Sequence, residues 1–180
     1  MTLPPGTSTR SAAPLKQLSA LTGLVLSACL FAGCSTDDAD SQVLTYDEYV
    51  AEYQKESKAF PYPLPDGQRF PSEPDYQGPQ DMSFQRGAGK SAVVQDYLCI
   101  EASEALTYLP TDEARAHAAL DRMQDVAYSD YASGYLEDPD RGMEADLIAP
   151  ARLGDPEPLR EFMTNSCGKD TFPDSVRAPQ

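Results

Sequence analysis

The sequence predicts a mainly α-helical fold: a small bundle in which a helical hairpin and flanking helices are wrapped by a proline-rich segment and closed by one disulfide. Apolar residues recur at helical spacing in several stretches after residue 45. Six prolines fall within residues 59–80, where a helix cannot continue. Cys99 and Cys167 remain for pairing once the cysteines near the N-terminus are set aside. Neither a strand nor an internal repeat is predicted.

Residues 1–33 have the composition of an export signal. They contain two basic side chains, Arg10 and Lys16, and no acid. An uncharged apolar stretch follows at residues 18–33. A basic start, an apolar run and small residues before a cleavage point are typical of a secretory signal. The apolar run of 16 residues is shorter than the roughly 20 that a membrane-spanning helix needs, so we expect cleavage.

Residues 30–34, LFAGC, resemble a bacterial lipobox, with Phe31 where that signal usually has leucine. The resemblance implies cleavage before Cys34 and a diacylglyceryl group on its sulfur. Two acyl chains anchor a protein stably, so we expect attachment to the extracytoplasmic side of the cell membrane. Cys29 is the alternative, because the residues before it also match. The polar residues after Cys34 favour Cys34 and make residues 34–44 a flexible lipidated tether. An ordinary cleaved signal with an incidental cysteine is a third reading.

One domain is predicted over residues 45–168. All 29 acids lie after Gly33 together with 12 of the 14 bases, which gives this part of the chain a formal charge of −17. Such a charge repels nucleic acid and anionic headgroups, so no nucleic-acid partner is expected. Outside the cytoplasm, Cys99 and Cys167 are expected to form a disulfide. Closing a loop of about 69 residues removes roughly 4 kcal/mol of unfolded-state entropy in the chain model.

The first helix is predicted to begin with a capping box, in which Thr45 is the N-cap and Glu48 follows three residues later, and to end near Lys58. Residues 59–80 then interleave aromatic side chains with prolines. This segment is either an exposed polyproline-type ligand or a strap that buries its aromatic side chains over the helices. The strap is favoured, because large apolar side chains are costly to leave in water.

Residues 90–109 and 111–127 predict the two helices of the hairpin. Pro110 ends the first helix and Thr111 is expected to be the N-cap of the second. The short connection between them favours antiparallel packing.

Glu101 and Glu104 fall in the first helix of the hairpin, with Glu101 close to the apolar stripe. We expect them to form structural pairs with arginines across the hairpin, such as Arg115 or Arg122. The alternative is that a buried carboxylate with a raised pKa performs acid–base chemistry.

The C-terminal part is predicted to hold two shorter helices. A helical piece at residues 143–149 should break at Pro150. The last helix should have Asp155 as its N-cap and Gly168 as its C-cap glycine, which brings Cys167 back toward Cys99. Residues 169–180 are expected to form a flexible tail.

Three motifs suggest chemistry without meeting its full requirements. Residues 87–91, GAGKS, end like a phosphate-binding loop, but Phe84 stands where the pattern needs its first glycine, so no nucleotide is expected. Residues 138–142, DPDRG, lack the ligand spacing of a calcium loop and read as an acidic turn. His117 is the one histidine, and the sequence has no nucleophile motif such as Gly-x-Ser-x-Gly for which it could act as the base. We therefore predict no catalytic residue, no metal ligand and no cofactor.

The order of a lipobox, a Pro/aromatic segment, Gly-x-Gly, residues 97–101 (YLCIE), residues 149–156 (APARLGDP) and a late cysteine is similar to that of uncharacterised putative lipoproteins of high-GC Gram-positive bacteria. This resemblance carries no activity. We expect a membrane-anchored, non-catalytic binding or interaction module, with an envelope protein as a candidate partner. The alternative is a cell-envelope hydrolase that uses paired carboxylates. A pocket with two converging carboxylates would favour the hydrolase.

Overall fold

The computed structural model describes residues 43–136, 138–168, 171–172 and 176. Within these residues the fold is mainly helical, as the sequence predicts. The export signal, Cys29, Cys34 and most of the tether lie outside the described residues. No helix in the described part of the chain is long and apolar enough to cross a membrane.

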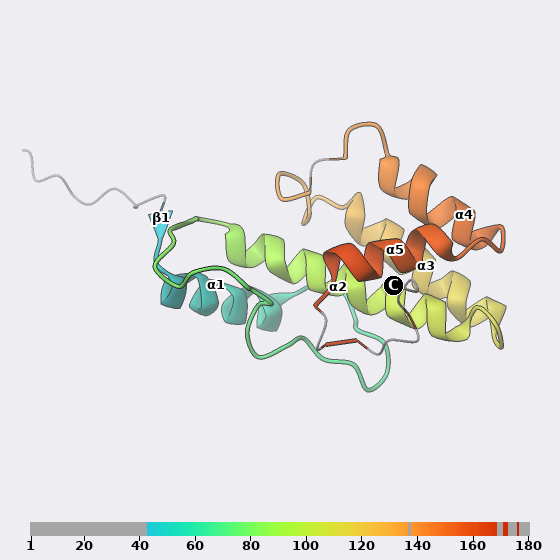
Figure 1. The fold of residues 1–180 in the computed structure, drawn as a ribbon, viewed down its shortest axis with the longest axis horizontal. Helices are drawn as coiled ribbons and strands as arrows, with labels where there is room; N and C mark the ends of the chain where they lie inside the picture. The colour runs from blue at the N-terminus through green and yellow to red at the C-terminus, as the bar shows by residue number, and fades with distance from the viewer. Residues whose placement is uncertain (1–42, 137, 169–170, 173–175, 177–180) are drawn as a thin grey trace, which may run out of the picture. The chain divides into compact units, whose positions relative to one another are not determined.

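Helix α2 (Ala88–Tyr108) is the centre of the domain, because α1 (Tyr46–Ala59), α3 (Glu113–Ala127) and α5 (Glu157–Ser166) all pack against it (Figure 1). The predicted capping box is present at the start of α1. The Glu48 carboxylate accepts the Thr45 backbone N–H at 2.8 Å, and the Thr45 hydroxyl accepts the Glu48 N–H at 3.4 Å.

Two glycines set how α2 begins. Gly87, its N-cap, has φ +94°, which an L side chain rarely adopts. At Gly89 an added Cβ would lie 2.5 Å from the backbone nitrogen of Tyr53 in α1. Glycine at position 89 therefore allows the backbone of α2 to lie directly against the backbone of α1.

The predicted hairpin is formed by α2 and α3, which make the most extensive helix pair of the domain. Its second helix is capped one residue later than predicted. Asp112, not Thr111, is the N-cap, and its carboxylate accepts the Arg115 N–H at 3.1 Å. A carboxylate at this end also interacts favourably with the helix dipole.

The prediction of a break at Pro150 is wrong. A π-helical turn, η1 (Met143–Ile148), runs directly into α4 (Ala149–Arg152). The Ala149 N–H donates to the carbonyl of Glu144, five residues back, so the ladder leaves the α-helical register just before the proline, which has no N–H to donate.

Helix α4 ends in a Schellman turn at Gly154, which has φ +89°. The Asp155 N–H donates to the Pro150 carbonyl at 2.9 Å, and the Gly154 N–H donates to that of Ala151 at 3.1 Å. The prediction that Gly168 is the C-cap glycine of the last helix is wrong, because α5 ends in an extended Cys167 and Gly168 does not have a positive φ.

Helix α5 starts at Glu157 with Pro156, rather than Asp155, as its N-cap. The Asp155 carboxylate still accepts the Glu157 N–H at 3.2 Å. Cys167 follows the last turn and forms the predicted disulfide with Cys99 of α2, with Cα atoms 5.8 Å apart.

The proline-rich segment packs as a strap. Phe60, Tyr62, Leu64 and Phe70 lie against the core, and the Phe60 ring is 4.8 Å from that of Tyr97 in α2. After the strap, β2 (Phe84–Gln85) pairs antiparallel with β1 (Val43–Leu44), a short sheet that the sequence does not predict. Residues 43 and 44 therefore belong to the domain rather than to the tether.

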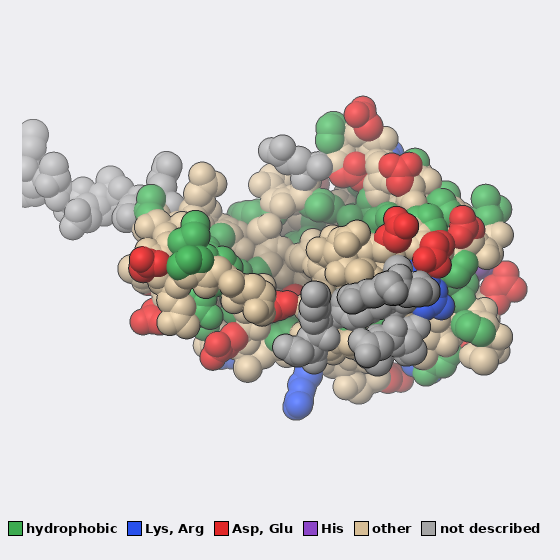
Figure 2. Space-filling model, viewed as in Figure 1, with side chains coloured by type: hydrophobic (Ala, Val, Ile, Leu, Met, Phe, Trp, Pro, Cys, Tyr) green, Lys and Arg blue, Asp and Glu red, His purple; other side chains and the backbone are tan. Residues whose placement is uncertain are grey.

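Two side chains of the segment predicted to be a flexible tail pack onto the core. Val176 is buried, and Phe172 is half-buried against the same cluster. Acidic side chains outnumber basic ones on the face that Figure 2 shows, as the net charge leads one to expect.

Candidate functional site

A polar cavity of about 540 Å³ opens between the N-terminal half of α2, the C-terminal end of α5 and the strap. We call it the α2–α5 pocket. Its lining is more polar than apolar and combines carboxylates, amides and hydroxyls, and among the described residues it contains no Lys, Arg or His. The lining residues are Tyr49, Pro74, Asp75, Gln77, Ala92, Gln95, Asp96, Thr164, Asn165, Ser166, Cys167 and Gly168.

Asp96 is the half-buried carboxylate of this pocket. The hydroxyl of Tyr53, a fully buried side chain of α1, donates to Asp96 Oδ2 at 2.5 Å. Burial raises the pKa of Asp96 to about 6; the Tyr53 hydrogen bond opposes this rise, and the negative charge of Asp75 adds to it. Asp96 is thus partly protonated near neutral pH.

Asp75 comes from the strap and is exposed at the mouth of the pocket. The side-chain amide of Gln77 donates to its Oδ1 at 2.6 Å. Gly168 leaves room for its other oxygen, because a Cβ on Gly168 would lie 2.5 Å from Asp75 Oδ2. The strap therefore brings a second carboxylate to the same cavity as Asp96.

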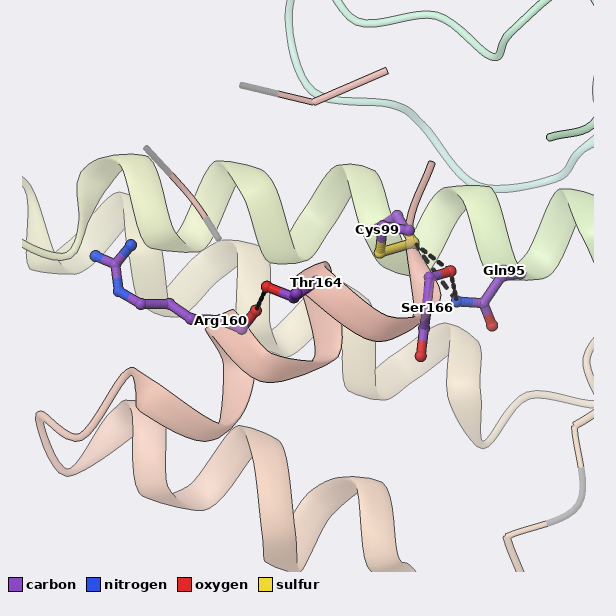
Figure 3. Close-up of a disulfide and its surroundings, with 6 residues drawn as sticks. Gln95, Cys99, Arg160, Thr164 and Ser166 are labelled. Atoms are coloured by element: carbon purple, nitrogen blue, oxygen red, sulfur yellow. Dashed lines mark hydrogen bonds between the residues drawn. A yellow bond between two sulfur atoms is a disulfide. The ribbon is translucent and has the colours of Figure 1, made fainter. Parts of the chain in front are cut away.

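The disulfide fixes the α5 wall of the pocket against α2 (Figure 3). The Gln95 amide nitrogen donates to the Ser166 carbonyl at 3.2 Å and reaches Cys99 Sγ at 3.5 Å. One covalent bond and one side-chain clamp thus hold the last turn of α5. The side chains of this wall keep a defined position over Asp96.

The glycine-rich motif at residues 87–91 already holds an anion from the chain itself. The carboxylate of Glu52 accepts the Gly87 N–H at 3.0 Å and the Gly89 N–H at 2.8 Å. The amides that a phosphate-binding loop would aim at a nucleotide are therefore used to cap α2 from α1. A second cavity of about 530 Å³ lies beside them, lined by acids and by Arg86 and Lys90.

The acidic turn at residues 138–142 uses its first aspartate for the backbone. The Asp138 carboxylate accepts the N–H groups of Gly142 at 2.6 Å and Met143 at 2.9 Å, and the Tyr128 hydroxyl at 2.8 Å. These bonds lower the pKa of Asp138. Its oxygens cap η1, and the described residues contain no group of three His, Cys, Asp or Glu side chains placed to hold a metal ion.

His117 lies on the outer side of α3 and pairs with Glu113 at 3.8 Å. The two acids near it in sequence have other partners: Asp112 caps α3, and Asp121 pairs with Arg152. No triad geometry forms around this histidine within the described residues.

The two glutamates of the hairpin form the expected pairs with arginines of α3. Arg122 holds both carboxylate oxygens of the fully buried Glu101 at 2.9 Å. Arg115 pairs with Glu104 at 2.6 Å. Burial raises the pKa of Glu101, and Arg122 opposes that rise. These carboxylates are structural.

Asp96, Tyr53 and Asp75 were not predicted as a site. Asp96 lies three residues before Cys99 and therefore on the side of α2 that faces α5. The predicted disulfide could have indicated this position, because it shows which side of α2 the last helix covers. Asp75 gives no such signal, because it belongs to an irregular segment.

Comparisons with known proteins add nothing to this description: no family model, no curated protein and no solved structure matches the chain.

Proposed function

We propose that the chain is an exported lipoprotein whose domain binds a small molecule in the α2–α5 pocket without changing it chemically. The export part rests on residues 1–34, which resemble a lipoprotein signal with Cys34 as the lipidated residue and Cys29 as its alternative. A domain tethered in this way samples solutes just outside the membrane.

The α2–α5 pocket is the observation that carries the binding function. A volume of about 540 Å³ is within the range of small-molecule sites. Its walls come from α1, α2, α5 and the strap, and the disulfide and the Gln95 clamp hold the α5 wall. A wall fixed before binding favours affinity, because less side-chain freedom is lost on binding.

A cell-envelope hydrolase is the second candidate, and one observation favours it. Asp96 and Asp75 share the pocket, and the pKa of Asp96 is raised to about 6 while Asp75 lies at the mouth. Two carboxylates in different environments are what acid–base cleavage uses. Under this alternative Asp96 is the general acid and Asp75 the base that activates water.

One experiment separates binding from turnover. The purified full chain is incubated with sugars, amino acids, amines and short peptides. After equilibrium dialysis, the molecular masses of the bound molecules are measured by mass spectrometry. Ala92→Trp fills the pocket from α2, and Ala118→Trp adds the same ring to the exposed face of α3. We expect a molecule of unchanged mass on the wild type and on Ala118→Trp, and none on Ala92→Trp. A shortened product would favour the hydrolase, and equal binding by Ala92→Trp would exclude this pocket.

The proposed cleavage and lipid attachment at Cys34 are tested separately. Cys34→Ala should move the protein out of the membrane fraction, while Cys29→Ala should leave it there. The intact mass of the membrane-extracted protein shows at which residue the chain is cleaved and whether a lipid is attached. Retention of Cys34→Ala in the membrane would assign the anchor to Cys29 or to an uncleaved leader.

A further inference from the structure

The α2–α5 pocket is rich in hydrogen-bond acceptors and negative in charge. Asp75 and Asp96 line it with no basic side chain among the described residues. The amide nitrogen of Gln95 is used on the Ser166 carbonyl. The amide oxygen of Gln95 and Asp96 Oδ1 accept no hydrogen bond from a described residue, and they are left for a ligand that donates hydrogen bonds.

Asp96 differs from the other half-buried and buried carboxylates described above. Glu101 and Glu104 each have an arginine, and Glu52 has two backbone N–H groups. Among the described residues, the one hydrogen-bond donor to Asp96 is the neutral hydroxyl of Tyr53, on Oδ2. No described residue donates a hydrogen bond to Asp96 Oδ1. A half-buried carboxylate with no cation among the described residues is costly to keep ionised.

We infer that the pocket binds a small organic cation that bears a primary ammonium or guanidinium group, with Asp96 Oδ1 as its principal acceptor and Asp75 as a second charge at the mouth. This inference rests on the proposed binding function and specifies its ligand class. A bare metal ion fits less well, because Ca²⁺ needs six to eight oxygen ligands and the described residues place no group of three His, Cys, Asp or Glu side chains to hold one. The formal charge of −17 after Gly33 also attracts cations toward the domain.

The protonation state of Asp96 gives this binding a direction with pH. The titratable groups that face Asp96 are Tyr53 and Tyr49 of α1 and Asp75 of the strap. The tyrosines stay neutral in the physiological range, since burial raises the pKa of both. With a pKa of about 6, Asp96 goes from roughly a tenth ionised at pH 5 to nine tenths at pH 7. Cation affinity should rise up to about tenfold over this range.

The test is calorimetric titration of the full chain with lysine, arginine and putrescine at 150 mM salt, where diffuse attraction is screened. Citrulline and N6-acetyllysine are the counterparts of arginine and lysine with a neutral side chain; they keep the α-ammonium and α-carboxylate groups and lose only the side-chain cation. Asp96→Asn keeps an oxygen that accepts from Tyr53 and removes the charge. Asp130→Asn removes one negative charge from an exposed position outside the pocket and is the matched control. Thermal melts check that both variants fold.

We expect at least one cation to bind, its neutral counterpart to bind at least tenfold more weakly, and Asp96→Asn to lose at least tenfold in affinity. Asp130→Asn should stay within about twofold. Equal effects of the two variants, or no cation binding at all, would overturn the inference. Calcium chloride is titrated in the same way, and tighter binding of calcium than of every organic cation would also overturn the inference. If a neutral molecule binds and Ala92→Trp prevents its binding, the inferred ligand class is wrong but the proposed binding function stands. If a cation binds equally well to Ala92→Trp, both the ligand class and the proposed binding pocket are wrong.

Discussion

Removal of Arg122 should be among the most damaging single changes in the hairpin. Its guanidinium holds both oxygens of Glu101, whose side chain has no exposed surface. Arg122→Met keeps much of the aliphatic packing and leaves the carboxylate buried without a cation. A buried ion pair broken in this way costs 3–5 kcal/mol, mostly because the remaining charge cannot be solvated. We expect a loss of about 3–5 kcal/mol in the free energy of unfolding at pH 8.

The loss should shrink at low pH. Burial raises the pKa of Glu101, and Arg122 is the main influence that lowers it. In Arg122→Met the folded-state pKa therefore rises further above that of the unfolded chain. A carboxyl whose pKa is raised on folding contributes stability at low pH, and that stability is lost as the pH rises through the folded-state pKa. The variant should accordingly be closer to wild type at pH 5 than at pH 8.

Urea titrations of four proteins at both pH values measure this effect: wild type, Arg122→Met, the double variant Glu101→Gln with Arg122→Met, and Arg115→Met. The double variant should recover part of the loss, because a neutral amide replaces the stranded charge. Arg115→Met is the comparison: Arg115 is 41% exposed and its partner Glu104 is 9% exposed, against 32% for Arg122 and 0% for Glu101, so a smaller loss is expected. A penalty that does not depend on pH, or that equals the penalty of Arg115→Met, would refute the argument.

Three further predictions concern the frame of the pocket. Gly89→Ala should lower the free energy of unfolding by about 2–3 kcal/mol in urea, because its Cβ would meet the Tyr53 backbone at 2.5 Å; a neutral effect would mean that α1 can move away freely. Replacing Cys99 and Cys167 together by alanine should cost up to about 4 kcal/mol at a separation of 68 residues, and a double variant as stable as the oxidised protein would contradict this. Tyr53→Phe should raise the pKa of Asp96 above its value of about 6, because the hydroxyl stabilises the ionised form; carboxyl NMR titration measures the change, and an unshifted value would remove that hydrogen bond from the account.

Local signals explain the parts of the fold that the sequence predicts correctly. The capping box of Thr45 and Glu48 is a contact between residues three apart, so a pattern of letters contains it. The Glu101–Arg122 pair was also foreseeable, because a short connection forces the hairpin to be antiparallel and leaves few cations within reach of a buried glutamate.

The missed features depend on contacts between distant segments or on turn geometry. Helix continuity through Pro150 depends on the π-turn before it, which hydrophobic spacing does not reveal. The burial of Val176 and the pairing of β1 with β2 arise where short segments meet a finished helical core. The register of two-residue strands such as β1 and β2 cannot be assigned from composition.

The pocket was missed for a related reason, since its carboxylates come from different kinds of structure. Asp96 lies in a helix next to apolar residues and looks like an ordinary polar position until Tyr53 and α5 cover it. Asp75 reaches the same place through the strap, whose path follows from where its aromatic rings pack. The hydrophobic pattern draws attention to Glu101 instead, and in the fold Glu101 pairs with Arg122.

The contrast between Glu101 and Asp96 is the strongest support for the proposed binding site. A folded-state pKa of about 6 against an ordinary 3.8 means that ionised Asp96 destabilises the domain at neutral pH by roughly 2–3 kcal/mol, and by less after allowance for its partial exposure to water. An asparagine could keep the Tyr53 hydrogen bond at no such cost. Proteins tend to keep destabilising groups where function requires them. A cation bound at Asp96 would offset the cost, so ligand binding and stability should rise together at neutral pH.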